Sequence, residues 1–410
     1  MKFFNVKTVD ETLAVIAREF HPFRQPVEVQ LDEALGMVLA EHVVSQEQVP
    51  HFTRSTVDGY AVKAKDTFGA SDSLPAFLDV TGKIEMGKAA VLPLKEGQAQ
   101  AIPTGGMLPE GADAVVMIEH VEEVGDLLNV YRHAAPGENL IRSGDDVEKG
   151  ALVMSAGQRL RPQDLGVLAA IGKTSVRVYP RPVIGILSTG DEVVPADKKV
   201  LAPGEVRDIN SMTISAAAKQ LGAKIVYGGI VNDDYDAFMA KAKELYEQVD
   251  FLLLSGGSSV GTRDFSVQVM QSLGKPGVLV HGVSIKPGKP TIIARAEDKP
   301  VMGLPGHPAS ALIIFHLFAV PIIEQLQGIR PSKVDKRLTA RIARNIPSAV
   351  GRTDYIRVKL EERPDGLWAV PVFGKSGLIS TLVESDGMVE IVANKEGILE
   401  GEMVKVHLFH

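Results

Sequence analysis

Two lysines in a short segment rich in proline and glycine are the first candidates for chemistry. Lys286 and Lys289 stand in the run Lys-Pro-Gly-Lys-Pro, whose prolines limit the conformations that the backbone can adopt. Such a segment presents two ammonium groups with little conformational entropy left to lose on binding. The competing interpretation is a solvated basic turn. Two fixed cations suit an oxyanion or a pyrophosphate, so the segment indicates an anion site.

Small and polar residues gather where predicted strands end. Residues 255–261 offer amides and hydroxyls at the start of a predicted helix, as phosphate-binding loops do, but match neither the Walker loop nor the Gly-x-Gly-x-x-Gly loop. A single junction of this kind could have small residues only because a strand–turn–helix connection requires them. Four such junctions in one domain indicate a ligand site at the carboxyl edge of a sheet. The candidate binding residues are Ser188, Thr189, Gly190, Gly256, Gly257, Ser258, Ser259, Gly261, Pro290, Pro305, Gly306 and Pro308.

Carboxylates accompany these segments. Glu192 and Asp264 fall in loops on the same predicted face, and Asp233 follows a nearby strand. Carboxylates beside a phosphate site usually hold Mg²⁺, a hard cation that takes oxygen ligands and bridges to phosphate oxygens. Taken singly, each acid could equally be a helix cap or a surface charge. Two further acids, Asp58 and Asp146, stand earlier in the chain, where the Asp-Gly pair at Asp58 by itself is typical of a tight turn.

Composition excludes several classes of protein. The 410 residues include no cysteine, which rules out disulfides, zinc–thiolate sites, iron–sulfur clusters and cysteine nucleophiles. The formal net charge of −7 argues against a general affinity for nucleic acid or for an anionic membrane. The ten histidines show no His-x-x-x-His spacing. Neither Ser188 nor Ser258 stands in a Gly-x-Ser-x-Gly elbow, which disfavours serine hydrolase chemistry.

The pattern of apolar residues predicts the elements that hold these groups. Between about 180 and 326, continuous apolar runs alternate with helical stretches, which predicts a mainly parallel, doubly wound sheet with helices on both faces. Residues 46–146 and 327–410 consist of short apolar runs between Gly, Pro and Asp, as in β-rich domains. The chain is therefore expected to combine an α/β domain with β domains.

Helical periodicity appears in three places outside the α/β region. A capping box formed by Thr8 and Glu11 predicts a helix that ends before Pro22. Further helices are predicted over residues 32–41 and 163–171.

Nothing in the sequence favours a membrane location. The start of the chain lacks the apolar run of a secretory signal. The most apolar stretch, residues 309–323, is shorter than the ~20 residues of a membrane span and carries His316 and Pro321. We therefore expect it to form a buried helix in a soluble, cytoplasmic protein.

Five motifs occur in one order along the chain. They are Asp-Gly-Tyr-Ala-Val (58–62), Ser-Thr-Gly-Asp-Glu (188–192), Ser-Gly-Gly-x-Ser-Val-Gly-x-x-Asp (255–264), Lys-Pro-Gly-Lys-Pro (286–290) and Leu-Pro-Gly-x-Pro (304–308). With this ordered set the chain resembles the MoeA family of molybdopterin molybdenumtransferases, whose animal relative is the carboxy-terminal domain of gephyrin. The resemblance covers essentially the whole chain, and the ordered set is far more specific than any one motif.

The resemblance implies an enzyme that binds adenylylated molybdopterin and molybdate, uses Mg²⁺ in splitting off AMP, and leaves molybdenum on the dithiolene sulfurs of the pterin. A cysteine-free chain is compatible with this activity because the pterin supplies the thiolates. By the same resemblance, the catalytic residues are Asp58, Thr104, Asp146, Glu192, Asp233, Asp264, Lys286 and Lys289, with Glu192 and Asp264 as metal ligands. Further oxyanion-site residues are Ser310, Arg357 and Ser376.

The sequence departs from the family pattern at one notable position. His307 stands where the family often has asparagine in Leu-Pro-Gly-Asn-Pro, and a histidine could add a pH-dependent charge near the ligand. Asp145 replaces a frequent glutamate.

The family architecture implies four domains in each subunit of an elongated homodimer. The domains expected here are 1–45 with 147–178 (linker and dimerisation), 46–146 (β-rich), 179–326 (α/β, molybdopterin-binding) and 327–410 (carboxy-terminal β-barrel). The resemblance places each active cleft between the α/β domain of one subunit and the β-rich domain of its partner. A transient contact with the adenylyltransferase that makes the substrate is also implied.

Two other functions remain open at this point. The related molybdopterin adenylyltransferase has the same α/β domain with a Ser-Gly-Gly loop, but it is a single domain, so the additional β domains argue against it. A non-catalytic scaffold like gephyrin would need an added domain and a long linker, neither of which is present in this sequence.

Overall fold

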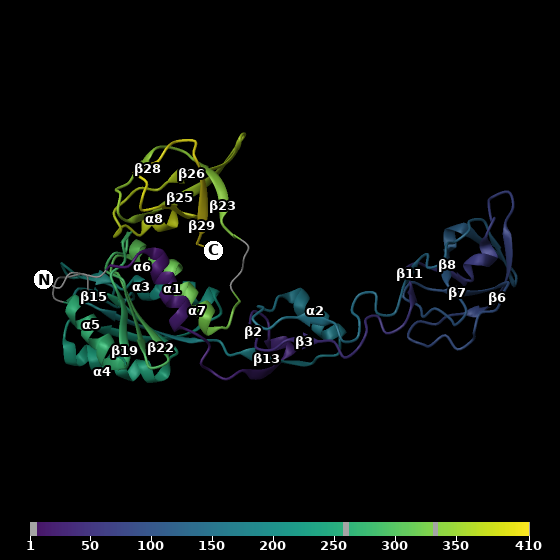
Figure 1. The fold of residues 1–410 in the computed structure, drawn as a ribbon, viewed down its shortest axis with the longest axis horizontal. Coiled ribbons are helices and arrows are strands. Elements are labelled where there is room, and N and C mark those ends of the chain that lie inside the picture. Colours follow the sequence, from purple (N-terminus) through teal and green to yellow (C-terminus); the bar gives the residue numbers. More distant parts are fainter. Residues whose placement is uncertain (1–5, 257–261, 331–334, 410) are drawn as a thin grey trace.

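The computed structural model describes residues 6–256, 262–330 and 335–409. The chain forms an elongated molecule with four units (Figure 1). A distal β unit stands at one end, and a small central unit connects it to an α/β unit and a barrel that lie together at the other end. We use these names for the distal unit (54–141), the central unit (27–44 with 152–179), the α/β unit (183–326) and the barrel (338–408).

The α/β unit is built on a six-stranded sheet. Four neighbouring strands are parallel, the fifth runs antiparallel to them, and the edge strand, antiparallel to the fifth, runs in their direction again, which confirms the predicted mainly parallel sheet. In sheet order the strands are β17 (Lys224–Val231), β14 (Val183–Thr189), β18 (Phe251–Gly256), β22 (Lys299–Leu304), β21 (Ile292–Ala296) and β19 (Pro276–His281). A two-stranded pair, β15 (Val193–Val194) and β16 (Val206–Arg207), follows β14.

Helices cover both faces of this sheet, because its strands are apolar on both sides. Along β18, Phe251 and Leu253 pack into one hydrophobic cluster, whereas Leu252 and Leu254 pack into another. The first cluster includes α3 (Asn210–Gln220), α6 (Pro308–Ile314) and α7 (Val320–Leu326); the second includes α4 (Tyr235–Gln248) and α5 (Thr262–Leu273).

The first helix, α1 (Val9–Glu19), begins at the predicted capping box of Thr8 and Glu11. Its buried residue Ile16, together with Phe20 directly after the helix, joins the first cluster of the α/β unit. Residues 1–45 therefore contribute to two units, since α1 packs on the α/β core while the following strands enter the central unit, although the sequence analysis assigned them to one domain.

The longest apolar helix runs through α6, a π-helical turn (Phe315–Ala319) and α7. Among the described residues, this stretch of 19 residues, Pro308–Leu326, is the one helix that is long and apolar enough to cross a membrane. Because 67% of an 18-residue window within it is buried inside the protein, we assign it as a core helix, which confirms the predicted buried helix.

The central unit is a small sheet whose strands come from two distant segments. The predicted helix at 163–171 is confirmed, but the one predicted at 32–41 is wrong, because Gly36 has a positive φ of 75° and the next residues pair with a strand. Its elements are β1 (Val27–Gln30), a 3₁₀ turn (Leu31–Glu33), β2 (Val38–Leu39), β3 (Val43–Val44), β12 (Leu152–Met154), α2 (Pro162–Ala170) and β13 (Ser175–Tyr179).

The distal unit is inserted between β3 and β12. The outgoing and returning segments are joined by an antiparallel bridge between Val49 and Val147, whose backbone N–H···O bond measures 2.8 Å. A six-stranded sheet closes over its own core of residues such as Tyr60, Leu128 and Val130. Its elements are β4 (Arg54–Ser55), β5 (Gly59–Val62), β6 (Ala76–Lys83), β7 (Gln98–Ile102), β8 (Ala114–Met117), β9 (Val121–Val124), β10 (Leu127–Val130), β11 (Leu140–Ile141) and the 3₁₀ turns Ala64–Thr67 and Ile118–His120.

The carboxy-terminal unit is a closed five-stranded barrel. Pairing of β25 with both β26 and β27 closes it, and buried residues such as Val358, Ile391 and Val406 fill its interior. A short strand of the α/β unit, β20 (Ile285–Lys286), adds to β25 in parallel. The barrel elements are β23 (Leu338–Ile342), β24 (Ile346–Pro347), β25 (Thr353–Arg363), β26 (Gly366–Pro371), α8 (Ser380–Val383), β27 (Gly387–Ile391), β28 (Gly397–Ile398) and β29 (Met403–Leu408).

Candidate active site

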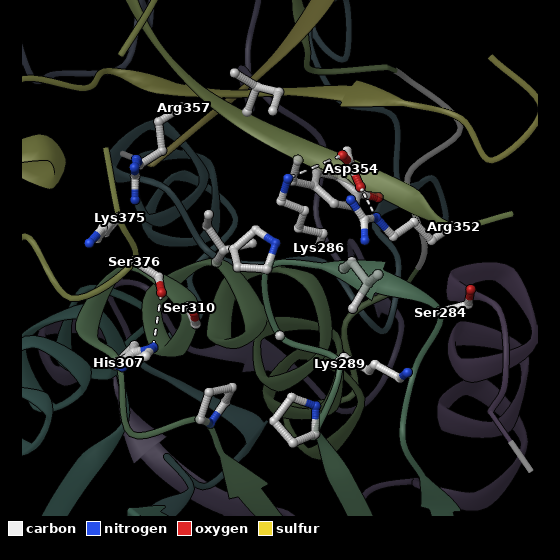
Figure 2. Close-up of a pocket in the computed structure, with 18 of the residues that line it drawn as sticks. Ser284, Lys286, Lys289, His307, Ser310, Arg352, Asp354, Arg357, Lys375 and Ser376 are labelled. Atoms are coloured by element: carbon white, nitrogen blue, oxygen red, sulfur yellow. Dashed lines mark hydrogen bonds and ion pairs between the residues drawn. The ribbon is translucent and has the colours of Figure 1, made fainter. Parts of the chain in front are cut away.

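A cleft of about 1230 Å³ opens where the α/β unit meets the barrel (Figure 2). Residues from the carboxyl ends of β18 and β22, from the start of α6 and from the barrel line it. This is the carboxyl edge of a parallel sheet, where ligands of doubly wound folds bind. The sequence-predicted site residues that line it are Gly256, Lys286, Lys289, Pro290, Pro305, Gly306, Ser310, Arg357 and Ser376.

The side chains of this cleft are predominantly cationic. Among its described lining residues there is one carboxylate, Asp354, against five lysine and arginine side chains. An excess of fixed positive charge in a concave site attracts anions and raises their local concentration. The basic residues are Lys286, Lys289, Arg352, Arg357 and Lys375.

The lysine turn is fixed from two sides. Gly288 has a φ of +104°, and a Cβ atom there would lie 2.3 Å from Cδ1 of Ile314 in α6, so only glycine fits. The Thr291 hydroxyl donates to the Gly288 carbonyl at 2.7 Å. With β20 paired to the barrel, this turn presents the exposed side chains of Lys286 and Lys289 on a rigid backbone.

Lys286 and Arg352 share a buried counter-ion. The Asp354 carboxylate is 1% exposed; its Oδ1 accepts a hydrogen bond from Arg352 Nε at 2.8 Å, and its Oδ2 lies 4.0 Å from Lys286 Nζ. Sequence analysis missed both Arg352 and Asp354. The available signal was their position two residues apart at the start of a strand, which places both side chains on one face.

A second group of residues surrounds the loop at 374–376. Arg357 is 7% exposed, and its burial lowers the pKa of the guanidinium. Its Nη2 donates to the Gly374 carbonyl at 3.0 Å, while its buried Nε finds no hydrogen-bond partner among the described residues. The Ser376 hydroxyl lies 2.9 Å from Nδ1 of His307, and its carbonyl accepts from the Ala309 amide (Figure 2). The sequence had not anticipated this contact of His307.

Asn210 at the start of α3 holds two strand exits together. Its Nδ2 donates to the Ser255 hydroxyl at the end of β18 and to the Gly306 carbonyl after β22, both at 2.9 Å. This buried amide therefore fixes the spacing of two segments that line the cleft, a role that the sequence did not reveal. Pro308, at the first position of α6, does not line the cleft; it starts the helix.

The exit of β14 lies outside the residues that line the cleft. Ser188 is buried and donates to the Asp208 carboxylate at 2.7 Å. Thr189 is buried against Gly256, where a Cβ atom would lie 2.1 Å from the Thr189 carbonyl, so glycine is required for this close approach. Gly190 has a φ of +140°, and a Cβ atom there would lie 2.7 Å from Oε2 of Glu192.

Three carboxylates crowd together at this exit. Burial, and then the charges of Asp191 and Glu192, raise the pKa of Asp233, whose amide donates to Asp191 at 3.0 Å. Carboxylate oxygens are the ligands that a hard divalent cation prefers, and a bound cation would relieve the repulsion between these carboxylates. Within the described part of the chain, however, no three His, Asp or Glu side chains are already arranged around a common metal position.

The candidate residues of the distal unit stand far from the cleft within this chain (Figure 1). Asp58 and Thr104 are in contact through hydrogen bonds, which lower the pKa of the Asp58 carboxyl. Asp146 does not join them: it lines a second cavity of about 930 Å³, beside Asp145 and Glu148, where the distal unit connects to the central unit.

Several predicted residues cannot be placed. Gly257, Ser258, Ser259 and Gly261 lie outside the described residues. Asp264 belongs to α5, but its side chain lies outside the described part of the structure.

Sequence and structure comparisons agree along the whole chain. Family models match at residues 7–172 (MoeA N-terminal region, domain I and II), 185–325 (probable molybdopterin binding domain) and 339–409 (MoeA C-terminal region, domain IV). The molybdopterin molybdenumtransferase of Bacillus subtilis is 34% identical over 93% of this chain and 89% of its own length. The enzyme of the same name from Haemophilus influenzae is 33% identical over 98% of each chain.

A solved structure of the molybdopterin biosynthesis MoeA protein from Pyrococcus horikoshii has the same fold. It superposes with a TM-score of 0.86 at 30% identity and covers 98% of this chain and 100% of its own. The combination of a doubly wound α/β unit with a closed carboxy-terminal barrel is thus shared along the full length. The chain belongs to the MoeA family of molybdopterin molybdenumtransferases, which are transferases of a late step in molybdenum cofactor biosynthesis.

Proposed function

We propose that this chain binds molybdate and adenylylated molybdopterin in the cationic cleft, inserts molybdenum into the pterin dithiolene and releases AMP. The observation that carries this proposal is Arg357. A buried guanidinium whose Nε lacks a partner costs free energy unless a ligand meets it, and an oxyanion is the ligand that does so best. The charge excess of the cleft supports the same conclusion, since both substrates are anions.

Two sets of polar and cationic residues suit the two anionic substrates, molybdate and adenylylated molybdopterin. Ser310, Arg357 and Ser376 offer hydroxyl and guanidinium donors for molybdate, and Lys286 and Lys289 add charge from the opposite segment. Because these groups hold the oxyanion in place, the two dithiolene thiols can bond to molybdenum while one molybdate oxygen leaves as water with the two thiol protons. The same lysines stabilise charge on the phosphates while a water molecule attacks the phosphate–phosphate linkage, which breaks so that AMP leaves and the pterin keeps its own phosphate.

Glu192 and Asp264 are the residues proposed to hold Mg²⁺, with Asp233 as a nearby acid. When bound, the cation would neutralise phosphate charge on the leaving group. The repulsion among the carboxylates at the β14 exit supports Glu192 and Asp233 in this role. Two described residues do the positioning: Asn210 fixes the exits of β18 and β22, and Gly256 permits the close approach of the exits of β14 and β18.

Asp58 and Thr104 reach the reaction, we propose, from a second copy of the chain. The elongated arrangement keeps them away from the cleft of their own subunit, which supports a homodimer with a shared active site (Figure 1). Asp146, on the segment that joins the distal and central units, belongs to the same proposal. A cytoplasmic location and a transient contact with the adenylyltransferase that supplies the substrate complete the proposed function, in line with the biosynthetic relatives.

Direct binding and turnover test the proposal. Isothermal titration should show molybdate binding to the purified protein, and incubation with adenylylated molybdopterin, molybdate and Mg²⁺ should release AMP. ATP consumption with molybdopterin in the absence of molybdate would instead identify an adenylyltransferase. A protein that binds neither molybdate nor adenylylated molybdopterin would refute the proposed function.

A further inference from the structure

The one acidic group of the described cleft lining occupies a specific place in the fold. Asp354 on β25 lies directly opposite Lys286 on β20, in a parallel pairing that joins the barrel to the α/β unit. The two residues therefore belong to different units, and their separation is set by backbone hydrogen bonds rather than by flexible loops. A carboxylate at this point lies close enough to attract the Lys286 ammonium group.

The two members of this pair are exposed to very different degrees. The Asp354 side chain is 1% exposed, whereas that of Lys286 is 60% exposed. One carboxylate oxygen already accepts a hydrogen bond from Arg352, and the other lies 4.0 Å from the lysine nitrogen, beyond hydrogen-bond distance. Asp354 consequently attracts the ammonium group without taking up its donors, which stay free for a ligand.

The negative charge also affects the ligand. Asp354 opposes the attraction that Lys286 and Arg352 exert on any anion in the cleft, since all three groups line the same cavity. An enzyme that binds an anionic substrate must also release an anionic product, and a cleft of unopposed cations would retain it.

We propose that Asp354 is a positioning residue that holds Lys286 over the cleft and limits the affinity of the cleft for anions, so that AMP can leave. This inference rests on the proposed function for its substrates. It concerns the balance between binding and release of anions. It predicts that one substitution of Asp354 raises the affinity of the cleft for anions and that another lowers it.

The first variant is Asp354→Asn, which removes the charge while its amide oxygen can still accept from Arg352. Molybdate and AMP should each bind roughly fivefold more tightly, as expected when one unit charge is removed from the lining of a water-filled cleft. In steady-state turnover, kcat and KM should fall together because AMP release slows. A merely structural loss would weaken binding instead.

The second variant is Asp354→Glu, which keeps the charge and moves the carboxylate toward Lys286. The additional methylene closes the present gap to hydrogen-bond distance, so the lysine donors are consumed and molybdate should bind roughly fivefold more weakly. This variant also keeps the proposal testable if the first does not fold. Glu362→Gln is the matched control, because Glu362 lies on the same strand, is exposed and does not line the cleft.

Titration calorimetry of the full chain with sodium molybdate, and separately with AMP, decides the matter. Tighter binding in Asp354→Asn and weaker binding in Asp354→Glu, with the control unchanged, supports the proposal. Unchanged or oppositely shifted affinity in either folded variant overturns it. Absence of molybdate and AMP binding in the unsubstituted protein would refute the proposed function itself, which is a distinguishable result.

Discussion

Asp58 and Thr104, 46 residues apart in the chain, form a two-point contact: Oδ1 of Asp58 accepts the Thr104 backbone N–H at 2.7 Å and the Thr104 hydroxyl at 3.0 Å. The backbone bond is the larger cause of the lowered pKa of Asp58, and the hydroxyl bond is the second. Asp58 is therefore an oriented, ionised carboxylate on the surface of the distal unit. Its second oxygen remains free of the Thr104 contact and can meet a ligand.

This contact leads to a prediction about activity. Asp58→Asn should leave the thermal unfolding midpoint unchanged, because the side chain is solvent-exposed and an amide oxygen can still accept both bonds. AMP release should fall at least roughly tenfold, since the amide keeps the contact with Thr104 but removes the charge that would meet the substrate. Asp126→Asn, an exposed acid of the same unit, is the matched control. Full activity in Asp58→Asn would show that Asp58 only forms a structural turn and takes no part in the reaction.

The lysine turn gives a second prediction. Lys286→Ala and Lys289→Ala should each weaken molybdate binding at least roughly tenfold, because each removes one charge-assisted contact. Folding should survive, since both side chains are exposed and the turn is held by Gly288. Calorimetric titration with molybdate measures the effect, and Lys359→Ala, an exposed lysine of β25 that does not line the cleft, is the control. Unaltered affinity in both variants would assign the segment to a basic surface turn.

A third prediction tests whether the active site is shared between subunits. An inactive Asp58→Asn subunit and an inactive Lys286→Ala subunit are mixed under conditions that allow exchange. In a shared site, half of the sites in each heterodimer collect both substitutions and the other half collect none, so activity returns. In sites built within one subunit, every site keeps one substitution. Verified heterodimers without activity would exclude the shared site while leaving the chemistry of the cleft intact.

The fourth prediction concerns stability against pH. Burial lowers the pKa of His316 to about 4, in a helix where its ring lies 5.2 Å from that of Phe409. Between pH 6.5 and 4 the unfolded chain binds a proton at this histidine and the folded chain does not, so stability falls as the pH falls through this window. The effect amounts to about 3 kcal/mol at most.

Urea unfolding at several pH values measures this contribution. His316→Leu should lose less stability than the unsubstituted protein between pH 6.5 and 4, and the difference should be constant above and below this window. His42→Leu, at an exposed histidine, should leave the pH dependence as it is. Parallel curves for His316→Leu and the unsubstituted protein would show that the buried ring does not contribute.

Local patterns predicted the parts of the site whose geometry is set within a few residues. The Lys-Pro-Gly-Lys-Pro turn is of this kind, because the positive φ of Gly288 and the prolines fix it from within. Asp354 could not be found in this way. Its importance comes from the pairing of β20 with β25, a contact between two units that no local periodicity encodes.

The wrong helix at 32–41 has a comparable origin. Its residues favour a helix, and a 3₁₀ turn does begin at Leu31, but Val38 and Leu39 pair with β13 from a segment far along the chain. Tertiary pairing thus outweighed local propensity. The contact between His307 and Ser376 was hidden for the same reason, since it joins the start of α6 to a barrel loop.

The bridge between Val49 and Val147 has a consequence for the order of folding. The central sheet needs strands from both sides of the inserted distal unit, and its formation must close a loop of roughly 100 residues, at an entropic cost that grows with the logarithm of loop length. The distal unit has its own core, so its folding brings the two ends of that loop together. The inserted unit thereby holds the two ends of the loop together. If it folds first, the entropic cost of pairing β1 and β2 with β13 is much smaller.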